Sequence, residues 1–82
     1  MSYKVVIDKP ARKFIAKQSQ EQQRRILQAL YKLPYEGDIS PMKGKVNQYR
    51  LRIGEYRAVY SVQNDVLTVD VLKVGPRGDI YK

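Results

Sequence analysis

The chain contains no cysteine and no histidine. Without cysteine it can form neither a disulfide framework nor a thiolate metal site. Without histidine, a histidine-based zinc site, a histidine general base and a Ser-His-Asp triad are all excluded. No apolar run approaches the roughly 18–20 residues that a membrane helix needs, and the N-terminal segment lacks the apolar core of a signal peptide. We therefore expect a soluble cytoplasmic protein with no membrane partner.

Acidic residues are half as numerous as basic ones. Sixteen Lys and Arg against eight Asp and Glu give a formal net charge of +8, and the pI is about 9.9. A field of this size attracts nucleic acid non-specifically and at a high rate. The charge therefore indicates an anionic partner.

The length and the apolar content limit the architecture. At 82 residues the chain has room for one domain, because a domain usually takes roughly 100–200 residues. A hydrophobic content of 43% excludes a disordered tail, which would be poor in apolar residues. We predict a single domain over residues 1–82, whose small core leaves it marginally stable without a partner.

The N-terminal half has the pattern of one strand and two helices. Residues 3–8 alternate between apolar and polar side chains, as a short strand does. A first helix is predicted from the N-cap Asp8 to about Gln18. A capping box that opens at Ser19 begins a second helix, which Pro34 ends. Two helices joined so closely form an αα-hairpin.

The C-terminal half has the pattern of a sheet. Residues 35–44 are rich in Gly, Pro, Asp and Ser and predict a long loop. Residues 48–74 alternate as strands, with turns at Gly54-Glu55 and Asn64-Asp65. Gly75-Pro76 is expected to break the last strand. The order β-α-α-β-β-β indicates an α+β fold, in which the helix pair packs on one face of a mainly antiparallel sheet.

The hairpin at Gly54-Glu55 predicts a cluster of arginines. A two-residue turn places Arg52 opposite Arg57, and Arg50 lies two residues away on the same face. The apolar residues of both strands share the other face, which is expected to lie under the helices. A slip of one residue would bury these arginines, so the register is strongly specified.

This arginine face has two interpretations. It is either a solvated sheet face, whose long side chains disperse their charge into water, or a phosphate-binding site. Like charges directly opposite each other destabilise a sheet, and the nearby acid is Glu55. Guanidinium groups bind phosphate oxygens bidentately and stay charged at every working pH.

The C-terminal segment has candidates for the same site. If the last strand lies beside the Tyr56–Val62 strand, Arg77 emerges near the turn end of the arginine face. Tyr81 then either stacks on a base or bonds to a phosphate, or it only holds the end of the chain against the core.

Other polar residues carry less weight. Lys43 and Lys45 would extend the basic surface, although lysines beside glycine in a loop are ordinarily just solvated. Arg24 and Arg25 are expected on an outer helix face, and Tyr31 at the rim of the core. No two carboxylates share an evident site, so metal-dependent nuclease chemistry has poor support. We expect no metal and no cofactor.

Two segments resemble the RelE/ParE toxin superfamily of bacterial toxin–antitoxin systems. They are MKGKVNQYRLRIGEYRAVYSV and LTVDVLKVGPRGDIY, and their most specific parts, YRLRIGEYRAVY and VGPR…IY, favour the RelE branch. The resemblance covers nearly the whole chain. It implies a RelE-like fold and a ribosome-dependent endoribonuclease that cuts mRNA in the A site without a metal. In that reaction the 2′-OH attacks the adjacent phosphate and leaves a 2′,3′-cyclic phosphate and a 5′-OH.

The resemblance also implies a role for individual residues. Arg57 matches the arginine that steadies the phosphate, and Arg77 matches a second arginine on the leaving-group side. Tyr81 matches a C-terminal tyrosine that is often assigned as base and stacking group. Arg50 and Arg52 fall where some relatives carry a lysine pair that binds and activates the reacting atoms. Because a guanidinium does not deprotonate near neutrality, their role here is expected to be electrostatic.

A second departure concerns the proton acceptor. Many relatives carry a histidine near the VG-x-R segment, where this chain has Pro76. Tyr81 is therefore the main candidate to accept a proton, with Lys82, Lys73 and Lys45 in reserve.

The resemblance leaves the activity open to alternatives and implies partners. One alternative is a ParE-like inhibitor of DNA gyrase without ribonuclease activity, and another is a non-toxic binder whose catalytic set has decayed. The implied partners are the ribosome, mRNA and an acidic, partly disordered antitoxin of the RelB kind. We expect this antitoxin to cover the basic face, to displace a C-terminal segment, or to do both.

Overall fold

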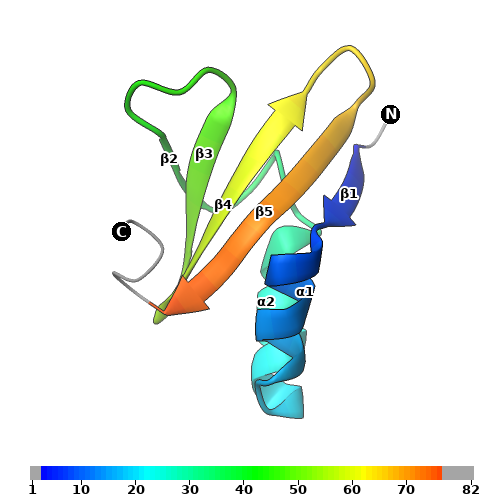
Figure 1. The fold of residues 1–82 in the computed structure, drawn as a ribbon, viewed down its shortest axis with the longest axis vertical. Helices are drawn as coiled ribbons and strands as arrows, with labels where there is room; N and C mark the ends of the chain where they lie inside the picture. The colour runs from blue at the N-terminus through cyan, green and yellow to red at the C-terminus, as the bar shows by residue number, and fades with distance from the viewer. Residues whose placement is uncertain (1–2, 77–82) are drawn as a thin grey trace.

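A five-stranded sheet with two helices on one side forms the structure, a computed structural model that describes residues 3–76 (Figure 1). The helices are α1 (Lys9–Ala16) and α2 (Gln20–Leu30), and the strands are β1 (Lys4–Ile7), β2 (Asp38–Pro41), β3 (Gln48–Ile53), β4 (Tyr56–Gln63) and β5 (Thr68–Pro76). The strand order is β1-β5-β4-β3-β2, in which β1 runs parallel to β5 and the other neighbours are antiparallel. The predicted α+β fold is confirmed, with one strand more than predicted.

The additional strand, β2, corrects the prediction of a loop over residues 35–44. It pairs with β3 at the edge of the sheet, where Ile39 lies opposite Leu51. A strand ending in Pro41 is tolerated there because one side of an edge strand needs no hydrogen-bond donor. Glycine and proline content marked the segment as a loop, although the contact of Ile39 with the core decides its conformation.

Both ends of β5 also differ from the prediction. Leu67, which the alternation placed in the strand, has a φ of 47° and belongs to the preceding turn. Gly75 and Pro76 were expected to break the strand, but they pair with the start of β4. The pairing with β1 extends only to Val71. Beyond Val71 one edge of β5 is unpaired within residues 3–76, and proline is tolerated at such an edge.

The helices begin much as predicted and end earlier. The side chain of Ser19 caps α2 by accepting a hydrogen bond from the backbone N–H of Gln22 at 3.2 Å. Asp8 is the N-cap of α1, but its side chain makes no capping bond. Helix α2 ends at Leu30, four residues before the predicted break at Pro34. Neither helix has the length and apolar content that a membrane crossing requires, among the residues described.

The core lies between the helices and one face of the sheet. Its buried side chains are at most 8% exposed, among them Ala11 and Ile15 from α1, Ile26 and Leu30 from α2, and Leu51, Ala58, Val69 and Val71 from the strands. Because these strand residues alternate with polar ones, their burial fixes which side chains face away from the helices.

The predicted hairpin register is confirmed. Ile53 pairs with Tyr56, Arg52 with Arg57, and Leu51 with Ala58. Gly54 supplies the positive φ of the turn, 57°, which residues with a side chain rarely adopt.

Tyr60 should make the folded protein sensitive to alkaline pH. It is 1% exposed, and burial, assisted by neighbouring Tyr49, raises the pKa of Tyr60 from 10.0 to about 12. Burial favours the neutral phenol over the phenolate. The contribution of neutral Tyr60 to the stability of the folded state is therefore complete below pH 10 and is lost as the pH rises towards 12. We expect the free energy of unfolding to fall by about 3 kcal/mol over that range.

Urea unfolding between about pH 9 and pH 12 would measure this loss. Tyr60→Phe should flatten the decline, whereas Tyr35→Phe, at a side chain that is 63% exposed, should not change it. An equally steep decline in Tyr60→Phe would contradict the assignment.

Candidate functional site

The hairpin register gathers three arginines on the sheet face turned away from the helices. Arg52 in β3 lies directly opposite Arg57 in β4, and Arg50 lies opposite Val59. Their alternation with the buried Leu51 and Ala58 places all three side chains on one face, as predicted. Directly opposed residues in an antiparallel pair have Cα atoms about 4.5–5.5 Å apart, so a single phosphate can contact Arg52 and Arg57 together.

A β-bulge in β5 adds Lys73 to this face. Val59 pairs with Lys73, while the next residue of β4 pairs with Val71, which leaves Leu72 as the extra residue. Simple alternation from the buried Val71 would turn Lys73 towards the helices. The bulge instead leaves Lys73 exposed and returns Val74, 6% exposed, to the core. Such bulges re-aim side chains and are frequent beside active sites.

We call Arg50, Arg52, Arg57 and Lys73 the basic face. Arg52 and Lys73 are exposed, and Arg50 and Arg57 are half-buried. One guanidinium nitrogen of Arg57, Nη1, donates to the carbonyl oxygen of Tyr56 at 3.2 Å. This bond orients the side chain and leaves further N–H donors of the guanidinium for an anion.

Val59 forms an apolar floor within the basic face. It is 7% exposed, although it does not belong to the core cluster between helices and sheet. Its cross-strand neighbours are Arg50 on one side and Lys73 on the other. Long cationic side chains cover apolar surface with their stems while their charged ends stay in water. The site therefore combines a nonpolar centre with a cationic rim.

One carboxylate on this face was missed from the sequence. Asp38 of β2 lies directly opposite Arg52, so the row nearest the turn carries Asp38, Arg52 and Arg57 side by side. An opposite charge across the strand offsets part of the repulsion between the two arginines. The segment that holds Asp38 was predicted to be a loop, because its residues do not alternate between apolar and polar as those of a strand do. The sequence therefore did not indicate that Asp38 lies in the sheet.

The lysines predicted to bind phosphate lie at the other end of β3 from the turn beside Arg52 and Arg57. Lys43 and Lys45 belong to the connection between β2 and β3, at the end of β3 away from the Gly54 turn (Figure 1). Counted from Gln48, the first residue of β3, Arg50 lies two residues along the strand and Arg52 four, which at roughly 3.3 Å per residue is about 7 Å and about 13 Å. The two lysines therefore lie closer to Arg50 than to the opposed pair of Arg52 and Arg57.

The C-terminal candidates Arg77, Tyr81 and Lys82 lie outside the described residues. The strand pairing on which the prediction for Arg77 depended is present, because β5 runs beside β4. Pro76, the residue before Arg77, pairs with Tyr56.

Arg25 makes a contact that the sequence did not predict. It is exposed, as expected for an outer helix face, and its guanidinium also lies against the β3–β4 turn. A Cβ atom added to Gly54 would lie 2.6 Å from Nη2 of Arg25. The turn that sets the arginine register is therefore also in contact with α2.

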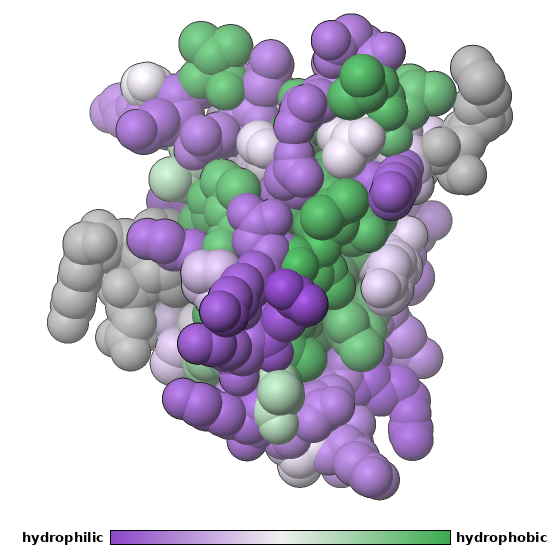
Figure 2. Space-filling view, turned by 45° about the vertical axis from the view of Figure 1, so that its right-hand side comes forward, coloured by the Kyte–Doolittle hydropathy of each residue, from purple (hydrophilic) through white to green (hydrophobic). Residues whose placement is uncertain are grey.

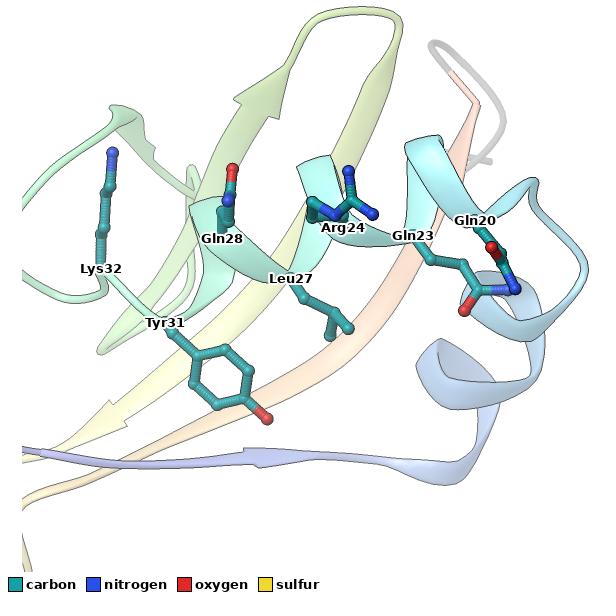
Figure 3. A pocket seen from close by; sticks show the side chains of 7 residues that line it. All are labelled: Gln20, Gln23, Arg24, Leu27, Gln28, Tyr31 and Lys32. Atoms are coloured by element: carbon teal, nitrogen blue, oxygen red, sulfur yellow. The ribbon is translucent and has the colours of Figure 1, made fainter.

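A second surface is a shallow groove along α2. Its residues are Gln20, Gln23, Arg24, Leu27, Gln28, Tyr31 and Lys32. Leu27 and Tyr31 lie on one flank of the helix, while Arg24, Gln28 and Lys32 project from the other (Figure 3). Tyr31 is 61% exposed, more than a position at the rim of the core requires. On the side of the molecule that carries the helices, apolar patches show between the polar residues (Figure 2).

Comparisons with known proteins agree with this architecture. The family model of the ParE toxin of type II toxin–antitoxin system, parDE, matches residues 9–81. The chain is similar to the archaeal RelE–RelB complex from Pyrococcus horikoshii OT3, with 32% identity, coverage of 96% of this chain and 99% of that chain, and a TM-score of 0.81. It is also similar to the RelB–RelE antitoxin–toxin complex from Methanococcus jannaschii, with 27% identity, coverage of 93% and 94%, and a TM-score of 0.74.

A comparison with curated protein sequences found no match. The isolated E. coli RelE toxin shares 23% identity over 98% of this chain and 92% of that chain, with a TM-score of 0.76, and this match concerns the fold alone. The matched family covers nearly all of the helices and strands described above. The chain therefore belongs to the RelE/ParE superfamily and is a toxin of a type II toxin–antitoxin system with a RelE-like fold.

Proposed function

We propose that this toxin is a ribosome-dependent endoribonuclease that cleaves mRNA in the A site. The observation that carries the proposal is the opposition of Arg52 and Arg57 on the open face of the sheet, with Arg50 beside them. When the 2′-OH of a nucleotide attacks its own 3′-phosphate, the phosphorus centre gains negative charge in the transition state. Cations held in place by strands favour that state over the ground state without any metal.

Each residue has a separate role in the proposed reaction. Arg57 steadies the scissile phosphate, and Arg77 stabilises charge on the leaving-group side. Arg50 and Arg52 act electrostatically, because guanidinium groups keep their protons near neutrality. Tyr81 accepts the proton of the 2′-OH. A codon held by the ribosome aligns the 2′-OH with the leaving oxygen, which is a proximity effect.

Lys43 and Lys45 bind RNA at a different point in this proposal. They precede the start of β3, which lies about 13 Å along the strand from Arg52, so the opposed arginines and not these lysines hold the scissile phosphate. Both are exposed, so we assign them to other backbone phosphates of the message or the ribosome. The reaction takes place in the cytoplasm, where the ribosomes are.

A ParE-like inhibitor of DNA gyrase is the second candidate function. The description of the matching family model favours it, and the shared fold would serve either activity. Under this alternative the basic face has no catalytic role. Inducible expression followed by mapping of RNA 5′ ends separates the two: cuts in phase with codons support the ribonuclease, whereas DNA damage signalling with intact messages supports gyrase inhibition.

Removing either proposed catalytic arginine should abolish cleavage. We expect Arg57→Ala and Arg77→Ala each to lower the rate of codon-phased cleavage by about 100-fold or more and to relieve growth arrest, because each removes charge that stabilises the transition state. Arg12→Ala, at an exposed position of α1, is the matched control and should keep full activity. Circular dichroism checks that the variants fold, and full toxicity of the double variant would exclude the proposed roles.

We further propose that an acidic antitoxin of the RelB kind binds this toxin and places an amphipathic helix in the α2 groove. The solved relatives from P. horikoshii and M. jannaschii are complexes of this type. In the groove, Leu27 and Tyr31 offer an apolar centre, and Arg24 and Lys32 flank it with positive charge. That arrangement complements a helix with an apolar stripe and acidic edges.

Truncation of the groove's apolar centre should weaken the antitoxin complex and leave catalysis intact. We expect Leu27→Ala/Tyr31→Ala to raise the dissociation constant by about 10- to 100-fold, because large apolar side chains dominate interface energies. Gln28→Ala, in the same groove, is the control and should change affinity by less than about threefold. Titration calorimetry with the antitoxin of the same system gives the affinity, and unchanged binding of the double variant would move the antitoxin to another surface.

A further inference from the structure

We propose that Lys73 is the general acid of the basic face and donates a proton to the 5′ oxygen that leaves the scissile phosphate. This inference rests on the proposed ribonuclease function. It concerns a residue that reaches the site only because of the β-bulge in β5.

The register places Lys73 within reach of the phosphate that Arg57 would bind. Arg57 pairs with Gly75 and Val59 pairs with Lys73, so Arg57 and Lys73 are diagonal neighbours on one face. Diagonal neighbours in an antiparallel pair are about 7–8 Å apart at the backbone. Lys73 is exposed, and the four-carbon stem of a lysine spans that separation with its ammonium group directed at an anion.

Lys73 also differs chemically from its neighbours on this face. Within residues 3–76, the other cations of the basic face are the guanidinium groups of Arg50, Arg52 and Arg57. A guanidinium stabilises charge but does not release its proton near neutrality, whereas an ammonium group can. The carboxylate of Asp38 lies on the same face, but an ionised carboxylate has no proton to donate. Lys73 is thus the group on this face that can protonate an alkoxide.

The proposed step balances without a co-reactant. The 2′ oxygen forms a bond to phosphorus and its proton passes to the base, which in the mechanism above is the phenolate of Tyr81. The bond between phosphorus and the 5′ oxygen breaks, and the 5′ oxygen takes a proton from the ammonium group of Lys73. Exchange with water then returns a proton to the amine and removes one from the base, so the enzyme is regenerated.

The apolar floor beside Lys73 fits this role. Val59 lies between Lys73 and Arg50 across the strands and is almost fully buried. A nonpolar surface beside Lys73 contacts the aliphatic stem of the lysine and leaves its ammonium group free to reach the leaving oxygen.

Two variants and two substrates test the assignment. Lys73→Arg keeps the charge but does not release a proton near neutrality, and Lys73→Ala removes both the charge and the proton donor. We expect each to slow cleavage of mRNA bound to ribosomes by about 100-fold, the usual contribution of general acid catalysis. The second substrate is an mRNA with sulfur in place of the 5′ bridging oxygen at the cleavage site. Its thiolate leaves without protonation, so both variants should cleave it within about threefold of the wild-type rate.

Lys4→Arg provides the matched control, because Lys4 is exposed on β1 and pairs with Thr68, at the other end of β5. It should behave like the wild type on both substrates. A wild-type rate in Lys73→Arg would overturn the inference, since charge alone would then suffice. An equal slowing of the Lys73 variants on both substrates would overturn it too, because it would indicate a role in binding. If the wild-type toxin cleaves neither message, the proposed ribonuclease function itself fails, which is a distinct result.

Discussion

The cross-strand opposition of Arg52 and Arg57 depends on the two-residue turn that joins their strands. Gly54 takes a φ of 57° there, and this backbone conformation sets which residues of β3 and β4 face each other. On the helix side the same register buries Leu51 and Ala58. The hydrophobic core therefore maintains a repulsive pair that would separate in an isolated hairpin, and the free energy of burial offsets the repulsion.

The β-bulge in β5 likewise determines which side chains enter the core and which face away from the helices. In a regular strand Val71 and Val74, three residues apart, would face opposite sides of the sheet, so only one of them could be buried in the core. The extra residue, Leu72, allows both to be buried. The same irregularity exposes Lys73 beside Val59. Core packing and the composition of the basic face are thus two results of a single departure from regular pairing.

Much of this architecture could be predicted from the sequence because local signals were strong. The turn at Gly54 and the alternation on both sides of it predicted the arginine cluster residue by residue. The place of Asp38 could not be predicted, since its strand is short and rich in turn-forming residues and is held in place by the contact of Ile39 with the core. Lys73 was named only as a reserve proton acceptor, and its place on the basic face could not be predicted. A bulge depends on which neighbours β5 acquires in the folded sheet, and the periodicity of β5 alone does not show it.

The two outermost strands of the sheet, β1 and β2, are only four residues long. One of them carries Lys4 and the other ends in Pro41. Short outer strands with a charge or a proline offer little template for joining the backbone of another molecule. At β1 and β2, edge-to-edge aggregation is therefore disfavoured even at times when no other protein covers these strands.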